Sequence, residues 1–270
     1  MMEAGLIVRP VIVLLCALLL LSACGHVEEM RSARQEQATE FNQRAQRAFQ
    51  RGEYQTAAAL YQNALQLDVA IENVNGIAVN TLNLARVSQV MGQPALAQRY
   101  LDSLLKDQAL HYAPAHLAAA AVQSSLLSLQ QDDEAGAGKW VEQAAAYCAS
   151  DCTLGGVIDN ARASIALHAS DADTALHWSE RGVSENRNAS PLEYANSLRL
   201  AASAKLLKND ADAALHLAEE ALAVDKSMGL PEKIRQDLLL AAQAHEKLGH
   251  AEQAAQCRDR AGRIAAASVK

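Results

Sequence analysis

Aromatic residues are scarce in this 270-residue sequence, at 4%, and there are only five prolines and two tryptophans. Hydrophobic residues still make up 50% of the chain, so alanine and leucine carry most of the apolar content. Alanine and leucine are strong helix formers, whereas proline and glycine interrupt helices. The composition therefore predicts an all-α protein, and the length allows either one large domain or an array of repeats.

Several signatures of catalysis and of nucleic-acid binding are missing as well. The sequence contains no glycine-rich phosphate loop, no nucleophile elbow and no HExxH pair. A formal charge of −7 argues against a general binder of phosphate backbones, which needs a basic face. We therefore expect no enzyme activity, no cofactor, no metal site and no nucleic-acid partner.

Residues 1–23 are expected to be a signal peptide. An apolar run extends from Leu6 to Ala23, is interrupted by Arg9, and ends in small residues. Such a short run suits an export signal better than a membrane span, with an uncleaved anchor helix as the alternative. The residues Leu21-Ser22-Ala23-Cys24 then resemble the lipobox of bacterial lipoproteins, in which the cysteine becomes the acylated first residue.

The lipobox resemblance implies that Cys24 carries three acyl chains, such as palmitate, because a single chain anchors a protein only marginally. Gly25 stands where Asp favours inner-membrane retention in well-studied Gram-negative lipoproteins, so the resemblance implies an outer-membrane lipoprotein on the periplasmic face. Residues 24–37 are then the acylated cysteine and a polar linker, unless this stretch extends the first helix of the fold.

A short pattern recurs along the rest of the chain. In each unit a turn residue is followed five and twelve positions later by small or apolar residues, as in Gly52, Ala57 and Ala64. The turns fall at 52, 92, about 132, 170, 209 and 249, a spacing of 38 to 40 residues. Self-similarity at this period indicates a helical solenoid. The expected helix pairs are about 38–51/54–67, 77–91/94–106, 115–130/134–147, 156–169/172–184, 192–207/211–224 and 232–247/251–265.

The first unit resembles the tetratricopeptide repeat (TPR) family. In that family small residues let the two helices of a hairpin approach closely, and a larger residue fills the gap to the next repeat. The matching residues here are Ala45, Gly52, Tyr54, Ala57, Tyr61, Ala64, Leu65 and Asp68. The resemblance implies an all-α, right-handed superhelical solenoid of about six TPR-like helical hairpins over residues 38–265, followed by a tail at 266–270.

The TPR resemblance also implies a place for a partner, because the first helix of each pair lines the concave surface of such solenoids. Amide and guanidinium groups at these positions suit the backbone or a carboxylate of an extended peptide. For each residue the alternative is an ordinary solvated helix face. The best cluster is Arg199 with its neighbours, and the full expected partner-binding set is Asn42, Gln46, Arg86, Asn160, Ser164, Asn196, Arg199, Ser203 and Gln243, with Gln89 and Gln236 at further positions of this kind.

Cysteine and tryptophan add two expectations. An oxidising periplasm would allow a disulfide between Cys148 and Cys152, whereas Cys257 is expected to be a small buried hydrophobic residue. Trp140 and Trp178 occupy equivalent positions on the second helices of their units, so we expect both in the packed core.

These features together favour a scaffold or adaptor, anchored in the outer membrane, that binds periplasmic or outer-membrane proteins and assists the assembly or regulation of an envelope complex. One alternative is a module that binds glycan or peptidoglycan, which would require exposed aromatic side chains. A second alternative is an accessory subunit of a cell-envelope enzyme, which would require titratable groups that converge in a pocket.

Overall fold

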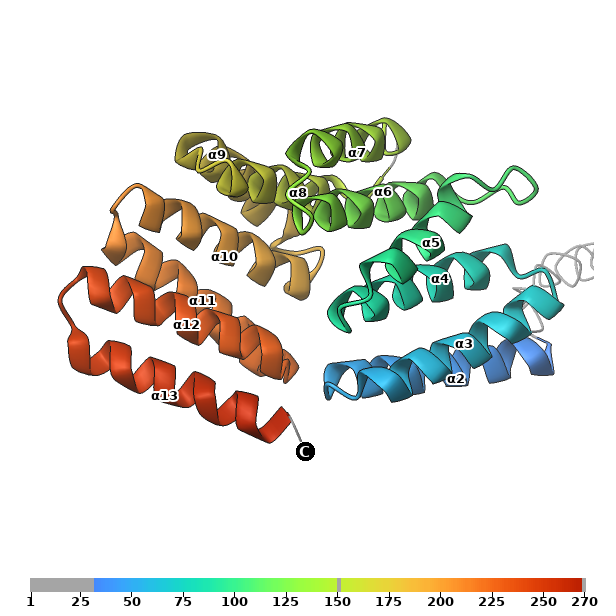
Figure 1. Ribbon diagram of the computed structural model, residues 1–270, viewed down its shortest axis with the longest axis horizontal. Coiled ribbons are helices and arrows are strands. Elements are labelled where there is room, and N and C mark those ends of the chain that lie inside the picture. Colours follow the sequence, from blue (N-terminus) through green and yellow to red (C-terminus); the bar gives the residue numbers. More distant parts are fainter. Residues whose placement is uncertain (1–31, 150–151, 269–270) are drawn as a thin grey trace, which may run out of the picture. The chain divides into compact units, whose positions relative to one another are not determined.

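The structure is a computed structural model that describes residues 32–149 and 152–268. The segment expected to be a signal peptide, the residues that resemble a lipobox, and Gly25 lie outside these residues. The chain from Arg34 onwards forms one compact unit, and all of its described helices are α-helices (Figure 1). In chain order they are α2 (Ala33–Gln50), α3 (Tyr54–Ala70), α4 (Val74–Val90), α5 (Pro94–Leu105), α6 (Pro114–Leu129), α7 (Glu134–Tyr147), α8 (Gly155–His168), α9 (Ala172–Asn186), α10 (Pro191–Leu207), α11 (Ala211–Met228), α12 (Pro231–Lys247) and α13 (Ala251–Ser268).

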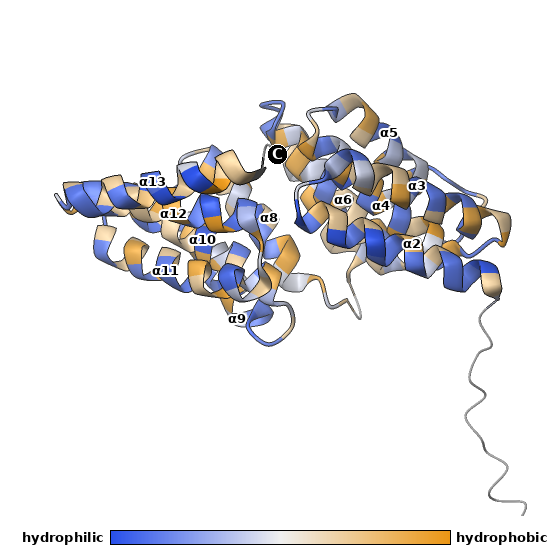
Figure 2. Cartoon of the chain, turned by 90° about the horizontal axis from the view of Figure 1, so that it is seen from below, coloured by the Kyte–Doolittle hydropathy of each residue, from blue (hydrophilic) through white to orange (hydrophobic). Residues whose placement is uncertain are grey.

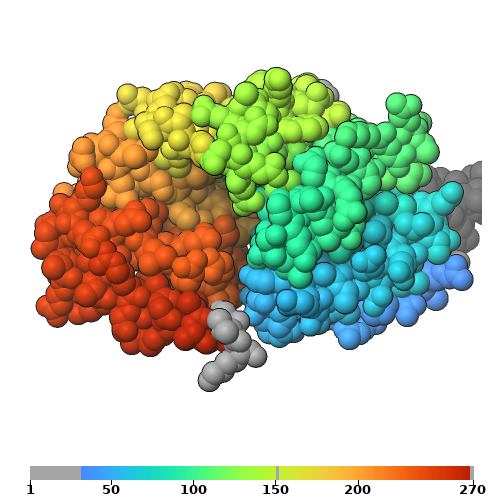
Figure 3. Space-filling model, in the orientation of Figure 1, coloured from blue at the N-terminus to red at the C-terminus, as the bar shows by residue number. Residues whose placement is uncertain are grey.

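The helices form six consecutive hairpins, which confirms the expected all-α solenoid. Each helix from α3 onwards packs against the next in the chain, and the first helices of successive hairpins, α4, α6, α8, α10 and α12, also pack against one another. The first helices therefore form a continuous layer, and the hairpins follow one another in sequence order (Figure 3).

A left-handed residue marks the turn of every hairpin, at each of the six predicted positions. The φ angle is positive at Gly52, Gly92 and Gly249, and also at Asp132, Ser170 and Asn209, which carry side chains. In each case the next residue's N–H returns to a carbonyl in the last turn of the first helix, as in Glu53 to Ala48 at 3.0 Å. This pattern is the Schellman closure, in which a left-handed residue satisfies the free carbonyl groups of a helix end.

Small residues pack the two helices of each hairpin closely together. The alanines five positions after the turns, from Ala57 to Ala254, are all buried. The small residues seven positions before the turns, from Ala45 to Ala242, are buried as well. Figure 2 shows apolar and polar residues alternating along the helices, as expected when one face packs and the other meets water. The apolar repeat thus places a thin, alanine-rich core between the helices of each pair.

The predicted boundaries differ from the structure by up to five residues, both at the two ends and within the array, where α4 begins at Val74 and not 77 and α11 ends at Met228 and not 224. α2 begins at Ala33, so residues 33–37 extend the first helix and do not belong to a linker. α13 continues to Ser268, beyond the expected end at residue 265. Within residues 32–149 and 152–268 no helix is both long enough and apolar enough to span a bilayer.

Candidate functional site

A groove of about 500 Å³ runs across the layer of first helices and is lined by side chains of five successive hairpins. Six of the predicted partner-binding residues line it, namely Arg86, Asn160, Ser164, Asn196, Arg199 and Ser203, together with Gln89 and Gln236. The first helices therefore bring residues that lie up to 150 positions apart in the sequence, from Arg86 to Gln236, onto one surface.

Three predicted residues lie elsewhere. Asn42 and Gln46 belong to α2 and are not among the residues that line the groove. Asn42 Nδ2 instead donates to Oδ1 of the buried Asn80 at 2.6 Å, which ties α2 to α4. Gln243 lines a second cavity, described next.

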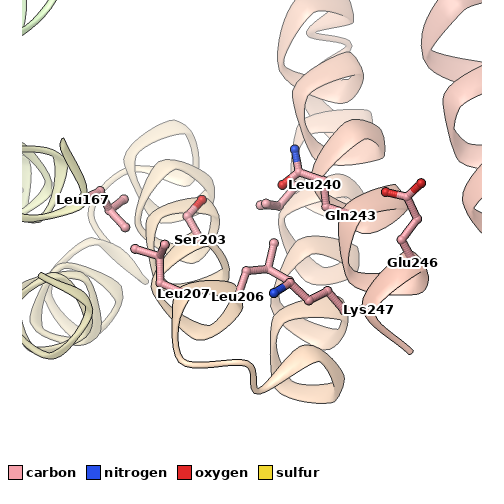
Figure 4. A pocket seen from close by; sticks show the side chains of 8 residues that line it. All are labelled: Leu167, Ser203, Leu206, Leu207, Leu240, Gln243, Glu246 and Lys247. Carbon is pink, nitrogen blue, oxygen red and sulfur yellow. The ribbon is translucent and has the colours of Figure 1, made fainter. Parts of the chain in front are cut away.

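A second, more apolar cavity of about 860 Å³ lies where α8, α10 and α12 end. It is lined by Leu167, Leu206, Leu207 and Leu240, with Ser203, Gln243, Glu246 and Lys247 around them (Figure 4). Leu207 is 46% exposed, which is unusual for a large aliphatic side chain of this protein. Ser203 lines this cavity and the groove alike, so the two are continuous along α10.

Arg199, at the centre of the predicted cluster, is held by buried acids. Its Nε donates to Asp237 Oδ1 at 2.7 Å, its Nη2 pairs with Asp225 Oδ2, and its Nη1 donates to Asn196 Oδ1 at 2.8 Å. Both aspartate side chains are completely buried, whereas that of Arg199 is 13% exposed. Arg199 therefore balances internal charge, and little of its charge is available to a partner.

Asp225 and Asp237 influence each other, in addition to their shared contact with Arg199. Burial raises the pKa of Asp237 to about 7, with Arg199 opposing the rise and Asp225 adding to it. Asp225 Oδ1 and Asp237 Oδ2 are buried and have no hydrogen-bond donor among the described residues. The raised pKa means that Asp237 binds a proton more readily than an ordinary carboxyl group, which reduces the repulsion between the two carboxyl groups.

Lys233 is the main groove residue that the sequence interpretation missed. Its Nζ donates to Asn196 Oδ1 at 3.0 Å, and it forms no ion pair with a carboxylate of the described chain. Burial, together with the guanidinium groups of Arg199 and Arg86, lowers the pKa of Lys233 to about 8, against the attraction of Glu193 and Asp225. The site thus holds a cation whose charge is only partly balanced.

Arg86 and Glu193 complete the charges that line the groove. Arg86 is exposed and lies over the ring of Phe49 at 4.8 Å, with no ion pair to a described carboxylate. Glu193 Oε2 accepts from Asn160 Nδ2 at 3.2 Å and from Asn196 Nδ2 at 3.1 Å. Since Arg199 is paired below the surface, the groove presents Arg86 and Lys233 against Glu193.

The third hairpin also contributes lining residues that were not predicted. Ala119, Val122, Gln123 and Leu126 of α6 form an apolar stretch of the groove. Gln123 Oε1 is buried and has no hydrogen-bond partner in the described chain, a state that costs on the order of 1–3 kcal/mol. The weak repeat signal of this unit hid these residues, although the α6 positions follow the same period as their neighbours.

Polar side chains join three of the five pairs of adjacent hairpins at equivalent positions, which we call the polar junctions. Each junction combines three residues, counted in sequence positions from the left-handed turn residue of a hairpin. The first lies ten positions before that turn, the second sixteen positions after it, and the third twelve positions before the turn of the next hairpin. The three sets are Asn42, Asp68 and Asn80; Asn160, Asn186 and Ser197; and Arg199, Asp225 and Asp237. Predicted groove residues Asn160 and Arg199 are therefore also structural links.

The second and third junctions are apolar at the two positions that lie on first helices. Leu82 and Ala120 share one core cluster, and Val122 and Ile158 share another. At the third junction Cys148 occupies the position filled by Asp68, Asn186 or Asp225 in the polar junctions, and the structure joins it to Cys152 in a disulfide with Cα atoms 4.9 Å apart. This junction thus has a covalent link where the polar junctions have hydrogen bonds or an ion pair.

The remaining predicted side chains divide between core and surface. Cys257 is buried and free, as expected, and Trp140 is half-buried against an apolar cluster. The expectation for Trp178 was wrong, since its half-buried ring contacts two guanidinium groups, with Arg162 Cζ at 4.6 Å and Arg181 Cζ at 4.9 Å from the ring centroid. Buried Asp159 pairs with both arginines and holds them beside the ring.

Sequence comparisons give no family for the chain. No protein-family model matches it, and no curated protein matches it significantly. Solved structures do match. BtubC (BKLC) from P. vanneervenii has a TM-score of 0.57 at 19% identity, covering 88% of this chain and 92% of its own.

Two further solved structures extend the likeness. A Rap protein complexed with competence and sporulation factor has a TM-score of 0.69 at 17% identity, covering 88% of this chain and 66% of its own. PilF of Pseudomonas aeruginosa has a TM-score of 0.50 at 17% identity, covering 84% of this chain and 90% of its own. The fold is a TPR-like solenoid. At these identities the likeness establishes the fold alone.

Proposed function

We propose that this protein is a scaffold that binds segments of other proteins in the groove formed by its first helices. The observation that carries the proposal is the groove itself, about 500 Å³ lined by five successive hairpins. Such a surface offers amide, hydroxyl and charged groups from successive helices, which suits an extended polypeptide. Rap, which shares the fold, has been solved in complex with competence and sporulation factor.

The sequence outside the described residues supports a location for this scaffold. Leu21-Ser22-Ala23-Cys24 follows an apolar run, and Gly25 follows the cysteine. We propose that Cys24 is acylated, that the protein is held at the outer membrane, and that the solenoid faces periplasmic or outer-membrane proteins of an envelope complex. A cysteine pair joined by a disulfide fits an oxidising compartment.

Chemical cross-linking and affinity capture of the full chain from native envelopes tests the proposal. Gln89→Trp/Ser164→Trp fills the groove and leaves Arg199 and its buried acids intact. Lys139→Trp/Glu219→Trp places the same bulk on exposed positions of α7 and α11 as a matched control. A third variant, Cys24→Ser, removes the expected acylation site.

We expect a discrete set of proteins with the parent chain and the control, and at least a tenfold lower yield with the filled groove. We expect Cys24→Ser to leave the membrane fraction and to lose incorporation of labelled palmitate. Equal capture by the filled-groove variant would place binding outside the groove, and recovery of glycan without protein would favour the peptidoglycan-binding alternative. Absence of labelled palmitate from the parent chain, or its incorporation into Cys24→Ser, would contradict the lipid anchor.

A further inference from the structure

The groove and the leucine-lined cavity are continuous, and they differ in chemistry. The groove presents Lys233 and Arg86, neither of which is paired with a carboxylate of the described chain. The cavity presents Leu207, Leu206 and Leu240. Ser203 belongs to both, so a single bound chain that follows α10 meets the cations first and the leucines next.

The electrostatic state of the groove favours a carboxylate. Arg199 is neutralised by Asp225 and Asp237, which leaves Lys233 and Arg86 opposed by a single lining carboxylate, that of Glu193, so these three charges sum to one positive charge. Burying a cation without a partner is costly, and an incoming anion removes that cost. The positive groove stands out in a chain whose formal charge is −7.

The helix geometry fixes the distance between the two features. Lys233 and Leu240 lie seven residues apart on α12, which is about 10 Å at roughly 1.5 Å per residue. Asn196, which binds Lys233, and Leu207 lie eleven residues apart on α10, about 16 Å. An extended peptide advances about 3.3 Å per residue, so the features match side chains roughly three to five residues apart.

From these contacts we infer that the scaffold recognises an extended segment of its partner with an acidic side chain at Lys233 and Arg86 and an aliphatic side chain, three to five residues away, in the Leu206–Leu207–Leu240 cavity. The inference rests on the proposed function and adds its specificity. The acid belongs to a side chain within the segment, because the groove continues past Lys233 along α8 and α6.

Binding of synthetic peptides to the detergent-solubilised full chain tests the inference. The probes are acetylated and amidated dodecapeptides of serine and alanine that contain one glutamate and one leucine at separations of one to eight residues, in both orders. Matched peptides replace glutamate by glutamine or leucine by serine, and one peptide carries a free C-terminal carboxylate in place of glutamate. Fluorescence anisotropy measures the affinity.

We expect the highest affinity at separations of three to five residues, and a loss of at least tenfold when either anchor is replaced. Lys233→Met is expected to abolish the preference for glutamate, and Leu207→Ser the preference for leucine. The matched variants Lys226→Met and Val69→Ser, which change exposed residues outside both cavities, are expected to bind like the parent chain.

Three results would overturn the inference: affinity independent of separation, equal binding of glutamate and glutamine peptides, or a requirement for the free C-terminal carboxylate. Absence of binding by every peptide would also overturn it. If the envelope capture still depends on an open groove in those cases, the proposed scaffold function is retained and only the inferred preference for an acidic and an aliphatic side chain is rejected. If filling the groove has no effect on the envelope capture either, both the groove-binding function and the inferred preference are rejected.

Discussion

The buried group of Arg199, Asp225 and Asp237 shows how one side chain can look like a binding residue in sequence and serve the fold in space. An arginine on the lining helix is expected to meet a partner, yet its guanidinium faces two fully buried carboxyl groups. Removing one partner of such a buried group leaves an uncompensated charge, which costs roughly 3–5 kcal/mol. A substitution that changes the charge at Arg199 is therefore expected to lower stability, so a loss of binding in such a variant would not show that Arg199 contacts the partner.

The raised pKa of Asp237 predicts a pH dependence of stability. Its carboxyl group binds a proton more tightly in the folded chain, where its pKa is about 7, than in the unfolded chain. The proton therefore stabilises the fold fully below about pH 4, and this stabilisation is lost as the pH rises through 7. Between pH 5 and pH 8 we expect the free energy of unfolding to fall by about 1–2 kcal/mol from this group.

Urea unfolding of the full chain in detergent at several pH values measures this effect. Asp237→Asn keeps the oxygen that accepts from Arg199 and removes the titration, so its stability is expected to change less between pH 5 and pH 8 than that of the parent chain. Asp212→Asn, at an exposed position of α11, serves as the control and is expected to follow the parent. Identical pH profiles for the parent and Asp237→Asn would contradict the assignment.

At the level of helices and hairpins, the repeat period and the small residues carry most of what can be predicted from sequence. Local rules determine where each helix ends, so the spacing predicts turns at Ser170 and Asn209 although neither is glycine, and both have left-handed φ angles. Alanine at fixed offsets predicts close helix packing in the same way, and Ala57 and Ala214 are fully buried.

Contacts between hairpins were not predictable in the same way. Asn160 has the sequence context of a groove residue, but its amide donates to the Glu193 carbonyl and its Oδ1 accepts from Ser197, 37 residues away. Lys233 was missed because it lies in the first turn of α12, and only the stacking of the hairpins brings Arg86 close enough to lower its pKa. Such contacts depend on the relative position of whole repeats, which a short pattern does not encode.

The disulfide at the junction between the third and fourth hairpins gives a second prediction about stability. The bond between Cys148 and Cys152 closes a very short loop, so the expected contribution to stability is only about 1–2 kcal/mol. Cys148→Ser/Cys152→Ser should lower the free energy of unfolding by this amount. Reduction of the parent chain should reproduce the loss, and the same reductant should leave the double variant unchanged. Equal stability of parent and variant, with or without reductant, would contradict a structural disulfide.

At the level of the whole molecule, the solenoid separates two tasks. The second helices and the hairpin turns maintain packing, while the first helices present one continuous surface that includes the groove and the leucine-lined cavity. A tether at Cys24 would hold this surface near the outer membrane and raise the effective concentration of the scaffold around envelope proteins. The account therefore depends on the groove being the surface that partners contact.

Site-specific photo-cross-linking in living cells tests that claim most directly. A photoreactive amino acid is placed at Gln89 or Gln236 in the groove, and at Lys139 or Glu219 on exposed second helices, in the otherwise unchanged full chain. The account predicts that the two groove positions cross-link the same discrete proteins and that the outer positions give at least tenfold less of them. Cross-links to those proteins from the outer positions alone, or equally from both surfaces, would contradict it.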